Sequence, residues 1–255
     1  MERGISPTLV PETGIRGIIE DLAYLLFIVV LSSLMIFFLA RFRRLSLLSL
    51  LFSFFSIFLS FMAPYSILSL IVGEGLLSIL VSMTMPMLWL IAFRLEHPKV
   101  ALLISSILVM LTGSLSGLVF TLLMPLYVVI LFLIVLSLYD YISVRSGPLK
   151  RLMELIPLSR DKGSISSLKG TPLFFVTAYI GIMNIGIGDI MSYTMLSCIS
   201  LFLIGIHGAM LSFLLLLSGL FITYLIMTRM KLKYAPGLPL PLLMGLLALA
   251  IFKAL

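Results

Sequence analysis

Charged residues and cysteines are scarce in this chain, and each scarcity excludes a class of protein. Only 11% of the 255 residues are Asp, Glu, Lys or Arg, whereas 62% are hydrophobic, and the mean hydropathy is +1.28. Water-soluble domains carry about 25% charged residues, so this composition predicts an integral membrane protein. The single cysteine, Cys198, excludes an internal disulfide and argues against a cysteine-based metal site.

Histidine is scarce as well, and its placement argues against a metalloenzyme. His97 and His207 are isolated, without the i, i+4 pairing of histidines that a zinc protease helix carries. We therefore expect no metal and no cofactor.

Apolar runs of about twenty residues predict an all-α polytopic membrane protein, because a helix needs about 20 residues to cross a bilayer. Pro64 is expected to close the second helix and Pro86 to kink the third. The prediction is eight spans, or nine if residues 1–20 contain another. The predicted helices are 21–41, 45–63, 66–93, 98–118, 121–143, 185–204, 209–229 and 236–254.

The chain is expected to fall into three parts. Residues 1–143 would form an N-terminal helical bundle, 144–184 a polar loop with a strand segment, and 185–255 a C-terminal part of three helices. Within the loop, residues 172–183 are rich in aromatic and β-branched residues and are bounded by Pro172 and Gly181. This pattern favours a short extended segment before the next helix.

The net charge of +7 comes from basic residues in short clusters between apolar runs, which predicts topology signals and argues against a nucleic-acid surface. The predicted helices place fourteen of the seventeen Lys and Arg residues on one side of the membrane. Since Lys and Arg concentrate in cytoplasmic loops, the loop at 144–171 is predicted to be cytoplasmic and both termini to face outward.

Two aspartates interrupt the apolar runs. Asp140 lies near the end of one predicted helix, and Asp189 near the start of another. Ionisable residues are expensive in hydrocarbon, so each is a functional candidate by default. Gly186 and Gly188 precede Asp189, and small residues of this kind let a neighbouring helix approach closely.

The motifs around these aspartates resemble the presenilin and signal peptide peptidase family of intramembrane aspartyl proteases. Tyr139-Asp140 matches the first family motif, and Gly186-Ile187-Gly188-Asp189 matches the second. The third, Pro-Ala-Leu, is represented by Pro236-Gly237-Leu238, with glycine in place of alanine. The resemblance is ordered over residues 139–238, roughly half of the chain.

The resemblance implies a presenilin-like helical bundle in which Asp140 and Asp189 are the catalytic pair. It also implies that Pro236, Gly237 and Leu238 lie beside the aspartates and shape the active site. Tyr139 is expected to be a wall or an orienting residue. The substrates would be transmembrane segments of membrane proteins, met within the lipid bilayer. Similarity to archaeal members that work without partner subunits implies a prokaryotic cell membrane.

The chemistry follows from two carboxyl groups close together in a medium of low dielectric constant, where both cannot ionise readily. One would take a proton from water and the other would protonate the peptide carbonyl oxygen. Two alternatives remain open at this point. One is a carboxylate-lined transporter or ion-leak channel on the same scaffold, and the other is an inactive membrane scaffold. The oligomeric state and the identity of the substrates are left open as well.

Overall fold

A computed structural model describes residues 45–146, 172–180, 183–230 and 235–254, together with single residues between 17 and 38. Part of the predicted first helix, and the loop at 147–171, lie outside the described residues. The chain divides into two compact units. The first unit comprises Met1–Leu34, Phe120–Gly147 and Ser192–Leu255, and the second comprises Met35–Val119 and Pro148–Met191.

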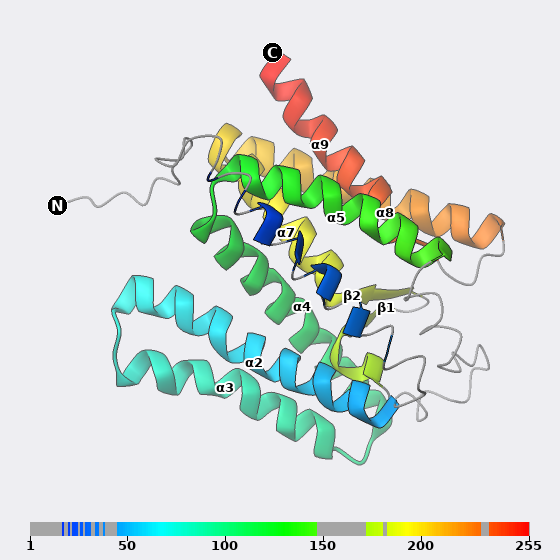
Figure 1. Ribbon diagram of the computed structural model, residues 1–255. Helices are drawn as coiled ribbons and strands as arrows, with labels where there is room; N and C mark the ends of the chain where they lie inside the picture. The colour runs from blue at the N-terminus through cyan, green and yellow to red at the C-terminus, as the bar shows by residue number, and fades with distance from the viewer. Residues whose placement is uncertain are drawn as a thin grey trace. The chain divides into compact units, whose positions relative to one another are not determined.

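In the second unit, helices α2 (Leu45–Val72) and α3 (Leu76–Arg94) pack side by side as a hairpin (Figure 1). The turn between them is glycine-rich, and Gly73 has a φ of +96°, a conformation that side-chain-bearing residues rarely adopt. Helix α4 (Pro98–Leu123) follows.

The boundary between α2 and α3 corrects the prediction that Pro64 closes a helix. Pro64 lies inside α2, and the break occurs nine residues later at Gly73. A proline interior to a membrane helix is tolerated when neighbouring groups satisfy the freed backbone, whereas positive φ ends the helix outright. The shift also moves Glu74 from a predicted span into an exposed turn.

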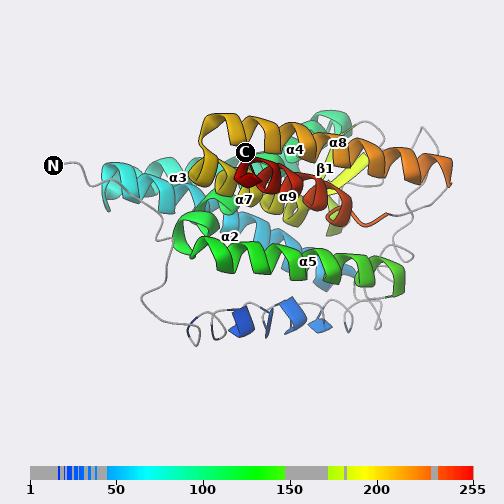
Figure 2. The same cartoon turned by 90° about the horizontal axis from the view of Figure 1, so that it is seen from above.

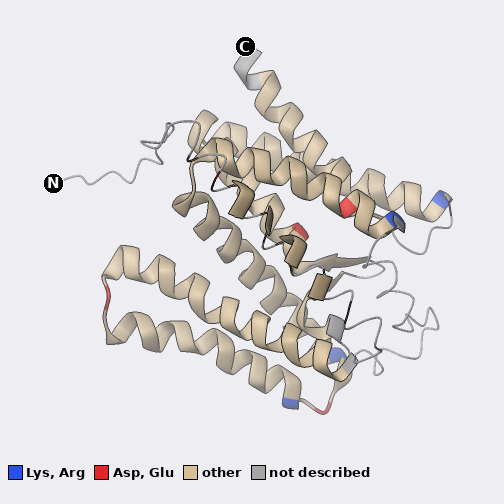
Figure 3. Ribbon diagram, in the orientation of Figure 1, with Lys and Arg blue, Asp and Glu red and all other residues tan. Residues whose placement is uncertain are grey.

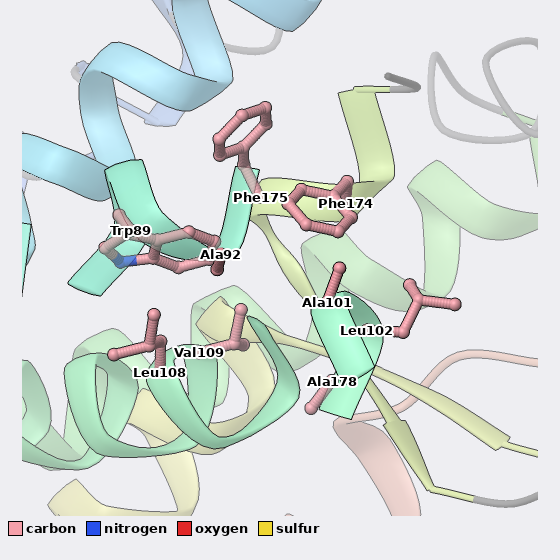
Figure 4. Packing of buried hydrophobic residues seen from close by; sticks show 9 residues of the cluster. All are labelled: Trp89, Ala92, Ala101, Leu102, Leu108, Val109, Phe174, Phe175 and Ala178. Atoms are coloured by element: carbon pink, nitrogen blue, oxygen red, sulfur yellow. The ribbon is translucent and has the colours of Figure 1, made fainter. Parts of the chain in front are cut away.

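An aromatic cluster forms the core of the second unit. Trp89 of α3 is fully buried, and its ring centroid lies 6.4 Å from that of Phe174 and 5.6 Å from that of Phe175. Figure 4 shows these side chains with their aliphatic neighbours from α3, α4 and the 174–178 segment. The remaining labelled members of the cluster are Ala92, Ala101, Leu102, Leu108, Val109 and Ala178.

Buried hydroxyl groups extend this core. Ser60 Oγ donates to the Ser56 carbonyl at 2.7 Å and accepts from Trp89 Nε1 at 2.7 Å. Because its one proton is used, the 2.8 Å contact with Thr112 Oγ1 has Thr112 as donor. Ser56 Oγ in turn donates to the Phe175 carbonyl at 2.7 Å, which ties the segment after residue 171 to α2.

The extended segment predicted within 172–183 is present as strand β1 (Thr177–Ile180), paired antiparallel with β2 (Met183–Gly186). Two boundaries differ from the prediction. Residues 172–175 form a 3-10 turn, η2 (Pro172–Phe175), and helix α7 (Ile187–Ile204) begins two residues later than predicted. The cause of the later start is strand pairing, because β2 uses residues 185 and 186 as partners of β1.

The first unit contains α5 (Leu126–Ser146), α8 (Ile206–Arg229), α9 (Pro239–Ala254) and most of α7. Within this unit α9 lies between α8 and α5 (Figure 2), and it contacts both. Its approach to α8 is close at Gly219, where an added Cβ would stand 2.5 Å from Pro241 Cα. Glycine lets the two helix backbones touch there.

Six helices of the described part are long and apolar enough to cross a membrane: α2, α3, α4, α5, α7 and α8. Charged residues lie mainly at their ends and in the turns (Figure 3). Many large apolar side chains remain exposed, including Phe54, Ile71 and Leu76. Such a surface suits lipid, which solvates apolar side chains but cannot satisfy backbone groups outside helices. The chain is mostly helical, as expected of a helical integral membrane protein.

Candidate active site

Asp140 lies six residues before the end of α5 and is half-buried. Its Oδ2 accepts a hydrogen bond from the backbone N–H of Leu238, at 3.1 Å. The two residues are 98 positions apart in the sequence, and both belong to the first unit. The first and third sequence motifs are therefore in direct contact.

The Pro-Gly-Leu segment forms the entrance to α9. The carbonyl of Leu238 accepts the N–H of Leu242 at 2.9 Å, so Leu238 is the N-cap and Pro239 the first helical residue. Proline suits that position because its missing N–H would have no partner in the helix. The helix thus begins three residues later than predicted. The Asp140 carboxylate consequently lies at the N-terminal end of α9, where the helix dipole favours negative charge.

Tyr193, a residue outside the predicted site, also holds this segment. Its hydroxyl donates to the Gly237 carbonyl at 2.7 Å, and both residues belong to the first unit. Tyr193 lies four residues after Asp189 on α7, and positions four apart share a helix face. That spacing was the signal in the sequence that could have identified it. Tyr139 adjoins Asp140 on α5 and is half-buried, and its role stays a prediction.

Asp189, in the second unit, is the third residue of α7. Its Oδ2 accepts the N–H of Gly186 at 3.2 Å. An acidic side chain at the third helical position that reaches back to the N-cap amide is one half of a capping box. Asp189 therefore stabilises the start of its own helix, and any catalytic role would be additional.

The start of α7 is also tied to the hairpin and to α4. The N–H of Ile187 donates to the Val176 carbonyl at 2.8 Å, which continues the pairing of β1 with β2. A Cβ at Gly113 of α4 would stand 3.1 Å from the Ile187 carbonyl oxygen and from the Ile190 side chain. Strand pairing and helix contact together orient the turn that carries Asp189.

The two glycines before Asp189 differ in what surrounds them within the second unit. At Gly186 an added Cβ would meet the Asp189 carboxylate, 3.3 Å from Oδ2. At Gly188, which is exposed, no heavy atom lies within 4 Å of the Cβ position. Within the second unit, the close approach of a helix to α7 occurs at Gly113, and the role predicted for the two glycines stays a prediction. Gly188 leaves open space beside the carboxylate.

Among the described residues, no three His, Cys, Asp or Glu side chains gather closely enough to hold a metal ion.

The sequence matches no protein-family model, and it matches no curated protein.

Proposed function

We propose that this chain is an intramembrane aspartyl endopeptidase that uses Asp140 and Asp189 as a catalytic pair. The observation that carries the proposal is the hydrogen bond from Leu238 N–H to Asp140 Oδ2. It joins two of the three motifs on which the family resemblance rests, across 98 positions of sequence. The contact places a backbone donor of the third motif directly on the carboxylate of the first.

In the proposed reaction one carboxylate removes a proton from water, and the resulting hydroxide forms a bond to the carbonyl carbon of the substrate. The other carboxyl group, protonated, donates its proton to the carbonyl oxygen. The resulting diol collapses when the C–N bond breaks: the carboxyl group that took the proton from water gives it to the leaving amine, and a diol hydroxyl returns a proton to the other carboxylate. The products are a carboxylic acid and an amine, and no covalent enzyme intermediate forms.

The entrance to α9 supports a site inside the membrane. Asp140 is six residues, about 9 Å, from the end of α5. Its bond to Leu238 brings the non-helical segment 236–238 to the same depth in the first unit. Starting there, α9 would need only about 21 Å to complete a 30 Å crossing, and its 16 residues span about 24 Å. Irregular backbone at this depth is expected where it lines a cavity.

On this reading α9 and the apolar segment at 22–31 complete a presenilin-like bundle of eight spans, or nine with a further one in residues 1–20. Charge asymmetry between loops supports a cytoplasmic 144–171 loop. The resemblance to archaeal members supports a prokaryotic cell membrane.

The substrate would bind along the outer edge of β2. Ile187 N–H bonds to Val176, which makes Ala178 and Ile185 the next hydrogen-bonded pair of the ladder. Asn184 therefore directs its N–H and C=O away from β1. Consistent with this register, the N–H of Tyr179 points away from β2 and donates to Ser106 Oγ of α4 at 2.9 Å. Helix α4 thus provides a hydrogen-bond partner for the outer edge of β1.

A substrate helix must unwind before its carbonyls can be attacked, since they are hydrogen-bonded within their own helix. An unwound segment could pair with the outer edge of β2, whose last residue is three positions before Asp189. The proposed edge thus leads toward one of the proposed catalytic carboxylates.

The test is cleavage of a panel of reporter single-span proteins by purified protein in lipid vesicles. Asp140→Asn and Asp189→Asn replace each carboxylate with an amide of the same shape. Glu74→Gln, in the exposed turn between α2 and α3, is the matched control. We expect both aspartate variants to lose cleavage while the control retains it.

Cleavage that survives either aspartate change would overturn the assignment of the pair. The transporter or channel alternative is tested in the same vesicles by proton and cation flux. Flux that depends on the aspartates, without cleavage of any reporter, would replace the proposal by that alternative. If neither cleavage nor flux is detected, the alternative that remains is the inactive membrane scaffold.

A further inference from the structure

One peptide group beside Asp140 is held at both of its edges. The Gly237–Leu238 peptide donates through its N–H to Asp140 Oδ2 at 3.1 Å, and its carbonyl accepts from the Tyr193 hydroxyl at 2.7 Å. A peptide group is planar, and in the trans form its C=O and N–H point to opposite sides. The two contacts are therefore not independent, because a rotation that breaks one also breaks the other.

The surrounding sequence makes this peptide group the movable part of the entrance to α9. Pro236 has a ring-locked φ, and Leu238 is restricted because it precedes Pro239. Gly237, between them, has the freedom of a residue without a Cβ. Residues 235–238 also lie outside helix and strand, so no ladder of backbone hydrogen bonds fixes their orientation.

We propose that Tyr193 is a positioning residue of the proposed protease: its hydroxyl fixes the plane of the Gly237–Leu238 peptide and thereby aims the Leu238 N–H at Asp140. The inference rests on the proposed function for its catalytic consequence. The structural part of the inference, in which the Tyr193 phenol is coupled to the Leu238 N–H at Asp140, does not depend on the proposed function.

The hydroxyl has a second effect through the same group. A donor on a peptide carbonyl polarises the amide and strengthens the hydrogen bond made by its N–H. Tyr193 therefore influences both the direction and the strength of the donor at the Asp140 carboxylate. A phenylalanine ring would keep the packing of α7 and lose both effects.

Spectroscopy tests the coupling without any need for activity. Labelling glycine carbonyls with ¹³C and leucine amides with ¹⁵N selects peptide groups in which leucine follows glycine, and the sequence contains five. Asp140→Asn identifies the group that donates to the carboxylate, because its ¹⁵N signal moves. Tyr193→Phe is expected to move that same signal, in both ¹⁵N and ¹³C. Tyr224→Phe, the same change on α8, should leave it in place.

Cleavage kinetics test the catalytic consequence. We expect Tyr193→Phe to lower kcat about tenfold, the equivalent of one hydrogen bond, while KM stays within about twofold. Tyr224→Phe should keep the wild-type kcat. A purely structural role for Tyr193 would instead reduce the folded fraction and leave kcat per folded molecule unchanged.

The outcomes separate the two proposals. If Tyr193→Phe and Asp140→Asn move different signals, or if Tyr193→Phe moves none, the coupling is overturned whatever the enzyme does. If the signals coincide but kcat per folded molecule is unchanged, the positioning role is overturned. Cleavage that survives Asp140→Asn overturns the proposed function alone, with the spectroscopic result intact.

Discussion

Replacing Gly219 with alanine should displace α9 and destabilise the first unit. An added Cβ would stand 2.5 Å from Pro241 Cα, 2.9 Å from Pro241 N and 3.0 Å from the Leu240 carbonyl oxygen. All three are backbone atoms, and ordinary contact begins at 3.4 Å. The first turn of α9 must therefore move by about 1 Å, because no side-chain rotation can relieve the overlap.

The expected cost follows from two opposing terms. Alanine in a helix interior is favoured over glycine by about 1 kcal/mol, whereas overpacking a close contact costs about 1–3 kcal/mol. The net destabilisation is up to about 2 kcal/mol, which lowers Tm by about 4–8 °C. A shift of this size near Leu238 would also weaken its 3.1 Å hydrogen bond to Asp140.

The matched control is Gly245→Ala on α9. There the added Cβ would stand 2.4 Å from Leu196 Cδ2, which is as close, but the obstacle is the end of a flexible side chain. A rotamer adjustment costs about 0.5–1.5 kcal/mol and is offset by the better helix propensity of alanine. Thermal unfolding of the purified variants in one detergent measures the difference. Equal Tm values for the two variants would refute the argument that backbone contact fixes α9.

Three further predictions concern the second unit. Ser60→Ala removes the acceptor of two buried donors, Trp89 Nε1 and Thr112 Oγ1, and should lower the free energy of unfolding by about 2–4 kcal/mol and shift the fluorescence of the single tryptophan, Trp89. The control Ser53→Ala, at a half-buried residue of the same helix, should change neither. Burial raises the pKa of the Tyr179 phenol above its usual 10.0, so its contribution to folding stability is complete below pH 10 and is lost at higher pH as the phenol ionises. In an ultraviolet titration, Tyr179→Phe should lack one of the tyrosines that ionise late. Loss of an early-ionising tyrosine would contradict this. Asn184→Pro should reduce the rate of cleavage about tenfold or more relative to Asn184→Ala. Proline removes the outward N–H of β2 but none of the hydrogen bonds between β1 and β2. Equal cleavage rates for the two variants would show that substrates do not use this edge.

Much of the candidate site was predictable from the sequence because motifs carry their own local structure. Asp189 was placed at the start of a helix, and it is the third residue of α7. Pro172 and Gly181 bounded an extended segment, and β1 lies between them. Such features depend on residues within a few positions of one another, so local propensity and hydrophobic pattern determine them.

Element boundaries were less predictable wherever a distant partner competed with a local signal. Pro64 is a helix breaker by propensity, yet α2 continues through it to Val72. Residues 185 and 186 continue a helical run by hydrophobicity, yet they pair with β1. At residues 185 and 186, hydrogen bonds to β1 outweigh an intrinsic preference of about 1 kcal/mol.

The sequence by itself determined that this protein is built of apolar helices, because burial in lipid requires long apolar runs. It also determined that carboxylates lie among these helices, because a charged residue within an apolar run is easily recognised. Only the tertiary structure decided that Leu238 donates to Asp140 and that Tyr193 holds the other edge of the same peptide. These contacts join residues 98 and 44 positions apart, and a separation of that size leaves no periodicity in the sequence. The close contact of α8 with α9 at Gly219 is likewise a tertiary feature, because the backbone of α9 occupies the space that a Cβ would need.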